Sequence, residues 1–129
     1  MDKLLRTLIL LFVLVMAACR QPEATPTPSV NLTLDIAYEP APPVVGAVTL
    51  VVTVLDAAGT AVDGATVAVR GDMAHAGMTS MDGQTDESEN GVYRIPFEWT
   101  MGGDWILTVT VTLPDGTSVV QAFNATIGS

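Results

Sequence analysis

Cysteine and positive charge are what this sequence has least of. The 129 residues include one cysteine, Cys19, so no disulfide can form within the chain and no thiolate metal site such as a zinc finger is possible. Lysine and arginine together number five, against fourteen aspartates and glutamates. Contact with the phosphates of nucleic acid needs the opposite balance, so we expect no nucleic-acid partner.

The first eighteen residues have the pattern of an export signal. Two basic residues precede an unbroken apolar run, Leu8 to Met16, which is too short to span a bilayer stably. The Met-Ala-Ala-Cys segment that ends at Cys19 resembles a bacterial lipobox, in which the cysteine is lipidated and becomes the first residue. We therefore expect a lipoprotein signal peptide over residues 1–18 and a lipid anchor on Cys19. The alternative is an ordinary signal peptide cleaved near Ala18.

The residues after Cys19 have the composition of a tether. They are rich in proline and threonine and contain no large apolar side chain that could anchor them to a core. We expect residues 19–31 to extend at about 3 Å per residue and to hold a domain a few tens of Å from the membrane. This organisation predicts a lipid-anchored protein on the extracytoplasmic side of the cell envelope.

Charge in the mature part is strongly negative. Removing residues 1–18 takes away Lys3, Arg6 and Asp2, which leaves three arginines, no lysine and thirteen acidic residues, a net charge of −10. An acidic surface attracts cations, but it also keeps exported proteins soluble. The charge is therefore compatible with a metal function and does not argue for one.

From residue 32 to residue 129 the pattern is that of a single all-β domain. This region is rich in valine and threonine and contains no long stretch of helical periodicity. Turn signals recur at short intervals: Pro42-Pro43, Ala58-Gly59, Asp63-Gly64, Asp82-Gly83, Asn90-Gly91, Gly102-Gly103 and Asp115-Gly116. Short β-runs between such turns predict an antiparallel Ig-like β-sandwich of about seven strands.

Alternating apolar residues locate the strands. We expect strands over residues 32–39, 47–55, 66–70, 92–99, 105–113 and 119–127, with a short return strand near 78–82. Residues 100–104 should form a hairpin in which two glycines adopt positive φ. Pro96 cannot donate to a ladder, so its strand should lie at an edge or carry a bulge there.

The large aromatic residues have structural interpretations. Tyr93 follows Gly91 in the Gly-x-Tyr arrangement of a tyrosine corner, in which the phenol bonds to the backbone upstream. Trp99 and Trp105 should both belong to the core on composition alone.

Beyond residue 18, all the methionines and the only histidine fall in one region: Met73, His75, Met78, Met81 and Met101. Thioethers and imidazoles are ligands that soft Cu(I) prefers over carboxylates and water. The alternative is that these methionines are adaptable filler in a core or an exposed apolar patch.

Chain direction decides whether these residues can meet. If one short strand returns after Met73, the next long strand delivers Met101 to the same end of the sandwich. An even number of crossings would place Met101 at the opposite end. Met78 and Met81 are three residues apart, so both can join a site only if the chain between them is irregular. Met81 is the weaker candidate because a turn is expected at Asp82-Gly83.

Two segments together carry a family resemblance: Gly71-Asp72-Met73-Ala74-His75-Ala76-Gly77-Met78, and Gly91-Val92-Tyr93 through Met101-Gly102-Gly103-Asp104-Trp105. Over residues 35–127 the chain resembles the YtkA-like or FixH-like family of small exported or membrane-anchored β-sandwich domains. The resemblance implies a role in extracytoplasmic copper handling, which in that family includes delivery to respiratory oxidases. FixH-like proteins usually carry a transmembrane helix, whereas this chain has a lipobox and a tether in its place.

We therefore expect a membrane-tethered copper-binding protein that holds or delivers Cu(I) through Met73, His75, Met78 and Met101, with Met81 as an optional ligand. Its partner would be an envelope protein that accepts or donates copper. No Ser/His/Asp set or paired carboxylates can be placed, so we expect no enzyme. The alternative function is a lipid-anchored interaction module without metal, which docks on another envelope protein.

Overall fold

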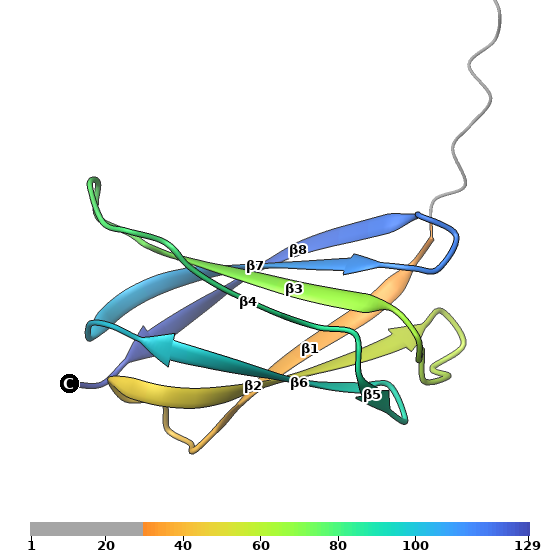
Figure 1. The fold of residues 1–129 in the computed structure, drawn as a ribbon, viewed down its shortest axis with the longest axis horizontal. Coiled ribbons are helices and arrows are strands. Elements are labelled where there is room, and N and C mark those ends of the chain that lie inside the picture. The colour runs from red at the N-terminus through yellow and green to blue at the C-terminus, as the bar shows by residue number, and fades with distance from the viewer. Residues whose placement is uncertain (1–29) are drawn as a thin grey trace, which may run out of the picture.

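The computed structural model describes residues 30–129, which form two four-stranded antiparallel sheets packed face to face (Figure 1). The strands are β1 (Leu32–Glu39), β2 (Gly46–Asp56), β3 (Thr66–Met73), β4 (Met81–Thr85), β5 (Ser88–Glu89), β6 (Val92–Trp99), β7 (Gly103–Thr112) and β8 (Ser118–Ile127). The predicted all-β sandwich is confirmed, with eight strands rather than seven. The predicted signal peptide, the anchor at Cys19 and most of the tether lie outside the described residues.

The order of the strands is that of an immunoglobulin sandwich. One sheet has the order β1-β2-β6-β5 and the other has the order β4-β3-β7-β8. In chain order these correspond to strands A, B, E and D facing C′, C, F and G. Residues 30–129 contain no helix that is long and apolar enough to cross a membrane.

The core lies between the sheets and comes from strict alternation along the strands. On β6 the side chains of Tyr93, Ile95, Phe97 and Trp99 are buried, as the sequence predicts. On β7 the buried set runs from Trp105 to Val111. Val48, Leu50, Val52 and Val54 of β2 complete the opposite wall. The prediction that both tryptophans belong to the core is confirmed.

The prediction of a turn at Asp82-Gly83 is wrong, because both residues lie inside β4. A Cβ atom at Gly83 would lie 2.8 Å from Cγ2 of Ile95 and 3.0 Å from the carbonyl oxygen of Pro96. Glycine is therefore needed here so that β4 can approach β6 closely, and not for a turn conformation. The strand before it is also longer than predicted, since β3 continues to Met73.

Pro96 lies on the exposed edge of β6. β2 pairs with β6 along its whole length, but β5 covers only Val92 and Tyr93 on the other side. Pro96 has no N–H to donate, but no strand of the described domain pairs with it on this side, so no ladder hydrogen bond is lost. The prediction of an edge position at this residue is confirmed.

Tyr93 connects β6 to the loop between β2 and β3. Its hydroxyl donates to the carbonyl oxygen of Val62 at 2.8 Å and accepts from the N–H of Ala65 at 3.1 Å. These partners lie 31 and 28 residues upstream. A tyrosine corner bonds only a few residues upstream, so the prediction of a backbone partner is right but the motif is a different one.

A carboxylate reinforces the same connection. The N–H of Gly91 donates to Oδ1 of Asp63 at 2.9 Å. This bond, with a smaller contribution from Ser88, lowers the pKa of Asp63 below its ordinary value. A carboxyl with a lowered pKa stabilises the fold above its unfolded pKa, and that contribution is lost as the pH falls through the folded pKa.

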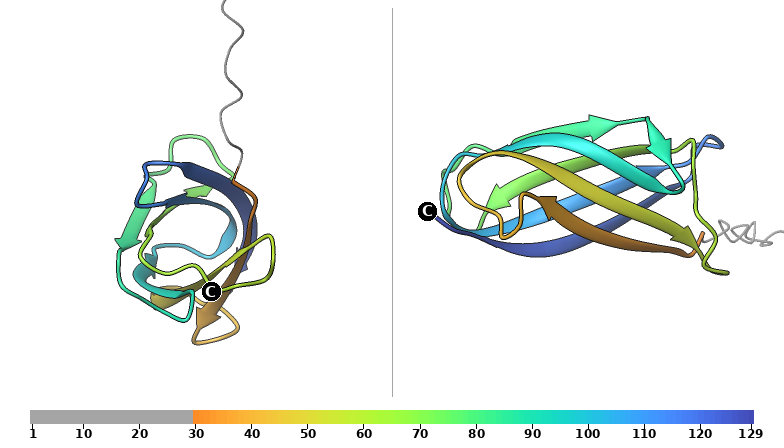
Figure 2. Two further views of the ribbon diagram at one scale, coloured as in Figure 1. Left: turned by 90° about the vertical axis from the view of Figure 1, so that its right-hand side faces the viewer. Right: turned by 90° about the horizontal axis from the view of Figure 1, so that it is seen from below.

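The sandwich has two distinct ends. The described chain begins at one end, near the loops that follow β2 and β7, which we call the tether pole (Figures 1 and 2). The other end, which we call the distal pole, consists of loop 40–45, loop 74–80, hairpin 100–102 and the C-terminal residues (Figure 1). The tether pole is the end nearest to the expected lipid anchor.

The contacts of Tyr93 generate a stability prediction. We expect Tyr93→Phe to lower the free energy of unfolding by about 1–3 kcal/mol, because it leaves the Val62 carbonyl and the Ala65 N–H without their partner. Tyr38→Phe is the control, since the Tyr38 hydroxyl makes no hydrogen bond to any residue of the described domain. Urea unfolding of the three proteins measures the difference, and equal losses for both variants would contradict this account.

Candidate metal centre

The five candidate ligands all lie at the distal pole. Met73 ends β3, His75 and Met78 lie in loop 74–80, Met81 begins β4, and Met101 lies in hairpin 100–102. One short strand, β4, returns between β3 and β6, as the convergence of these residues at one end requires. The ligand set is thus gathered at one end of the sandwich, but its members differ in exposure and in support.

Met73 is held against the hairpin by the main chain of two strands. It lies opposite Trp105 in the β3–β7 ladder, so both side chains point to the inner side of the sheet. Its side chain is half-buried and packs against the core. A Cβ atom at Gly103 would lie 3.4 Å from the Met73 methyl carbon, so the thioether reaches across the start of β7.

Met81 is also half-buried and packs against the core. It lies opposite Gly71 in the β3–β4 ladder and shares its inward direction. A Cβ at Gly71 would lie 2.9 Å from Cζ of Phe97, which shows how tightly the core fills this space. The position of Met81 therefore fits the alternative that this methionine fills the core better than the prediction that it binds metal.

His75 and Met78 lie on a loop with few constraints. Both side chains are exposed, and the projecting tip of loop 74–80 stands away from the sandwich (Figure 1). Ala74 donates to the carbonyl oxygen of Asp104 at 3.2 Å. Within the described part of the chain, residues 75–80 make no main-chain hydrogen bond outside the strand ladders. A metal site that includes both Met78 and Met81 needs an irregular backbone between residues 77 and 81. The backbone is irregular before β4, and Gly77 has a φ of +85°.

Met101 has an exposed side chain, but its main-chain carbonyl group is held by a hydrogen bond. The side chain is 46% exposed, whereas its carbonyl oxygen accepts a hydrogen bond of 3.0 Å from Nε1 of Trp105. Of the two glycines that follow, only Gly103 adopts a positive φ, at +123°. The prediction of positive φ at both glycines is therefore wrong for Gly102, which packs closely on the C-terminal residues.

Harder ligands are not gathered anywhere in the described domain. Residues 30–129 contain no group of three or more His, Cys, Asp and Glu side chains that could hold a metal ion. Two acidic side chains near the distal pole already have partners. Asp72 pairs with Arg70 at 3.0 Å, and Asp104 accepts from the Thr126 hydroxyl at 2.9 Å. The donors that this pole offers are thioethers and one imidazole.

An apolar rim that was not predicted from the sequence also lies at the distal pole. Val44 is 45% exposed and Val45 is 43% exposed, in the loop between β1 and β2. The N–H of Val45 donates to the carbonyl oxygen of Gly128 at 3.0 Å, which fixes this loop at the distal pole. The available signal was two adjacent valines between Pro43 and the next strand, where polar loop residues are usual.

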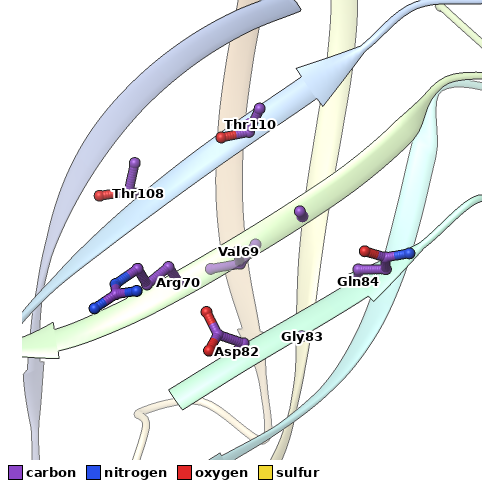
Figure 3. Close-up of a pocket in the computed structure, with 8 residues that line it drawn as sticks. Val69, Arg70, Asp82, Gly83, Gln84, Thr108 and Thr110 are labelled. Atoms are coloured by element: carbon purple, nitrogen blue, oxygen red, sulfur yellow. The ribbon is translucent and has the colours of Figure 1, made fainter. Parts of the chain in front are cut away.

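A hollow in the domain lies away from this pole, on the outer face of β4, β3 and β7 (Figure 3). It is open and shallow, and its polar lining includes Asp82, Gln84, Thr108 and Thr110. Arg70 also borders it, but this guanidinium is paired with Asp72. The hollow contains none of the candidate ligands and no enclosed space, so we do not treat it as a functional site.

The different burial of the methionines predicts different costs of removing them. We expect Met73→Ala to lower the free energy of unfolding by about 1–3 kcal/mol, because it removes side-chain packing at the end of the core. Met78→Ala should change it by no more than about 0.5 kcal/mol, because that side chain is exposed. Chemical denaturation of the metal-free proteins measures both, and a Met78 variant as unstable as the Met73 variant would contradict this division.

Comparison with known proteins identifies the family. A protein-family model described as YtkA-like matches residues 28–110, which extend from before β1 into β7. No curated protein and no solved structure matches the chain significantly. The family match covers well over half of the chain and contains every candidate metal ligand. The protein therefore belongs to the YtkA-like family.

Proposed function

We propose that this protein binds Cu(I) at its distal pole and holds or delivers copper outside the cytoplasm. The observation that carries the proposal is that every thioether and imidazole beyond residue 18 lies at one end of the sandwich. Cu(I) is the biological ion for which such a soft donor set is suited. The copper association that the family resemblance implies supports the same conclusion.

How firmly the structure holds each candidate ligand suggests how the site forms. Met73 is already fixed beside the hairpin that carries Met101. His75 and Met78 lie in the part of loop 74–80 beyond Ala74, for which no main-chain hydrogen bond outside the ladders is found in the described domain, so this part can fold over toward the hairpin to complete three or four ligands. Met81 stays optional, because it would have to leave its packing against the core.

Selectivity follows from the same donors. Cu(II) prefers a tetragonal set of nitrogen and oxygen ligands. The distal pole supplies one imidazole, and two acidic side chains near it, Asp72 and Asp104, are engaged with Arg70 and Thr126. We therefore expect the site to prefer Cu(I) over Cu(II).

A competition titration with a Cu(I) chelator tests the proposal. The full-length chain should carry Cys19→Ser, so that its only thiol cannot bind the ion. We expect one Cu(I) per chain, and a loss of roughly tenfold or more in affinity for each of Met73→Leu, Met78→Leu, Met101→Leu and His75→Gln. Met81→Leu is the matched control, and leucine is used because it keeps the volume of methionine.

Proton competition gives a second readout of the same titration. An imidazole must be neutral to bind metal, so protons and Cu(I) compete for the same nitrogen. Affinity should therefore fall on acidification in the parent protein and depend less on pH in His75→Gln. Absent binding, or binding that survives a combined Met73→Ala, His75→Ala and Met78→Ala change, would remove the copper hypothesis.

The anchor is part of the proposal and has its own test. We expect the mature protein to begin at lipidated Cys19 and to sediment with membranes after cell lysis. Cys19→Ala should release the protein or leave it unprocessed. A wild-type protein that is fully soluble outside the cell, with a free N-terminus at another residue, would contradict the lipid anchor.

A second candidate function is a docking module without metal. It is favoured by the exposed apolar residues, because Val44, Val45, Met78 and Met101 are four of the six large hydrophobic side chains that the described domain exposes. Methionine-rich surfaces adapt to partners. The chelator titration separates the two functions, since a docking module would not compete for Cu(I).

A further inference from the structure

We propose that Trp105 is the positioning residue of the distal pole, which holds Met101 beside Met73 and thereby raises the affinity for Cu(I). The inference rests on the proposed function, but it concerns a residue that donates no ligand atom. Its basis is one residue that pairs with Met73 in the β3–β7 ladder and whose side chain bonds to the main chain of Met101.

Trp105 is linked to the two residues in different ways. Trp105 lies opposite Met73 across the β3–β7 ladder, on the same inner side of the sheet. Its Nε1–H donates to the carbonyl oxygen of Met101 at 3.0 Å. The ring is 1% exposed and packs edge-to-face on Trp99, with centroids 5.3 Å apart, so it cannot easily turn away.

This bond is an important constraint on the hairpin. Among the hydrogen bonds outside the strand ladders, no other bond in the described domain reaches residues 100–102. Without it, the tip that carries Met101 would be anchored only by the strands at either end. If Met101 is already held in place, less conformational entropy is lost when the metal binds. The hydrogen bond should therefore raise the affinity for Cu(I).

The neighbouring tryptophan provides a matched control. Trp99 is as buried as Trp105, and the two rings are in contact. However, Nε1 of Trp99 is buried without a hydrogen-bond partner among the described residues. Trp99→Phe and Trp105→Phe therefore remove the same atoms from the same cluster, but only Trp105→Phe breaks a hydrogen bond.

The experiment measures Cu(I) affinity for both variants in the full-length Cys19→Ser chain. Trp105→Phe should bind Cu(I) about threefold to tenfold more weakly, which corresponds to the loss of one ordinary hydrogen bond. Trp99→Phe should stay within about twofold of the parent. In the metal-free proteins, backbone NMR order parameters at residues 100–102 should fall in Trp105→Phe and not in Trp99→Phe, because only Trp105→Phe removes the hydrogen bond to the Met101 carbonyl oxygen.

A second variant covers the case in which Trp105→Phe does not fold. Replacing Trp105 with 3-benzothienylalanine keeps the size and shape of the indole and removes only the N–H donor. The same loss of affinity and the same fall in the hairpin's order parameters are expected for it.

The outcomes separate this inference from the proposed function. Equal Cu(I) affinities for the folded Trp105 and Trp99 variants would overturn the role of Trp105 and leave the copper site standing. A parent protein that does not bind Cu(I) would overturn both. Weaker binding and lower hairpin order parameters that are confined to the Trp105 variants would support the inference.

Discussion

The distal pole depends on the packing of three aromatic rings between the sheets. Trp99 contacts Phe97 and Trp105 edge-to-face, with centroid distances of 5.1 and 5.3 Å. Such pairs add to the large apolar area that each ring buries. Gly71 and Gly83 make room for this layer, because a Cβ at either position would come within 3.0 Å of a core side chain. The end of the sandwich is therefore closed by a rigid aromatic layer, on which the candidate ligands are placed.

This packing divides the candidate ligands into a fixed part and a free part. Met73 is held by the β3–β7 ladder, and the main chain at Met101 is bonded to the indole of Trp105. Loop 74–80, which carries His75 and Met78, has no comparable support after Ala74. In the proposed copper site, an ion would bind on the fixed side and the loop would close over it. The same freedom of the loop would then allow release to a partner.

Periodicity predicted most of the fold, because alternation of apolar residues is a local signal. The inward faces of β6 and β7 could be predicted from the sequence in this way. The wrong predictions concern residues whose role depends on contacts with distant parts of the chain. Asp82-Gly83 has the composition of a turn, but Gly83 is needed for the close approach of β4 to β6. The partners of Tyr93 lie about 30 residues upstream, and no local pattern predicts them. The candidate ligands could be named from composition and topology, whereas their unequal burial depends on packing across the sheets.

The position of the site relative to the chain entry has a functional consequence. The described chain begins at the tether pole, and the candidate ligands lie at the opposite end (Figure 2). In the proposed anchored protein, the tether would join the domain at the end opposite to the candidate ligands. The apolar rim at Val44 and Val45 lies at the same pole as the ligands. A copper-accepting protein could then contact the rim and the ligands together, so that the transfer surface and the metal site would be the same face of the molecule.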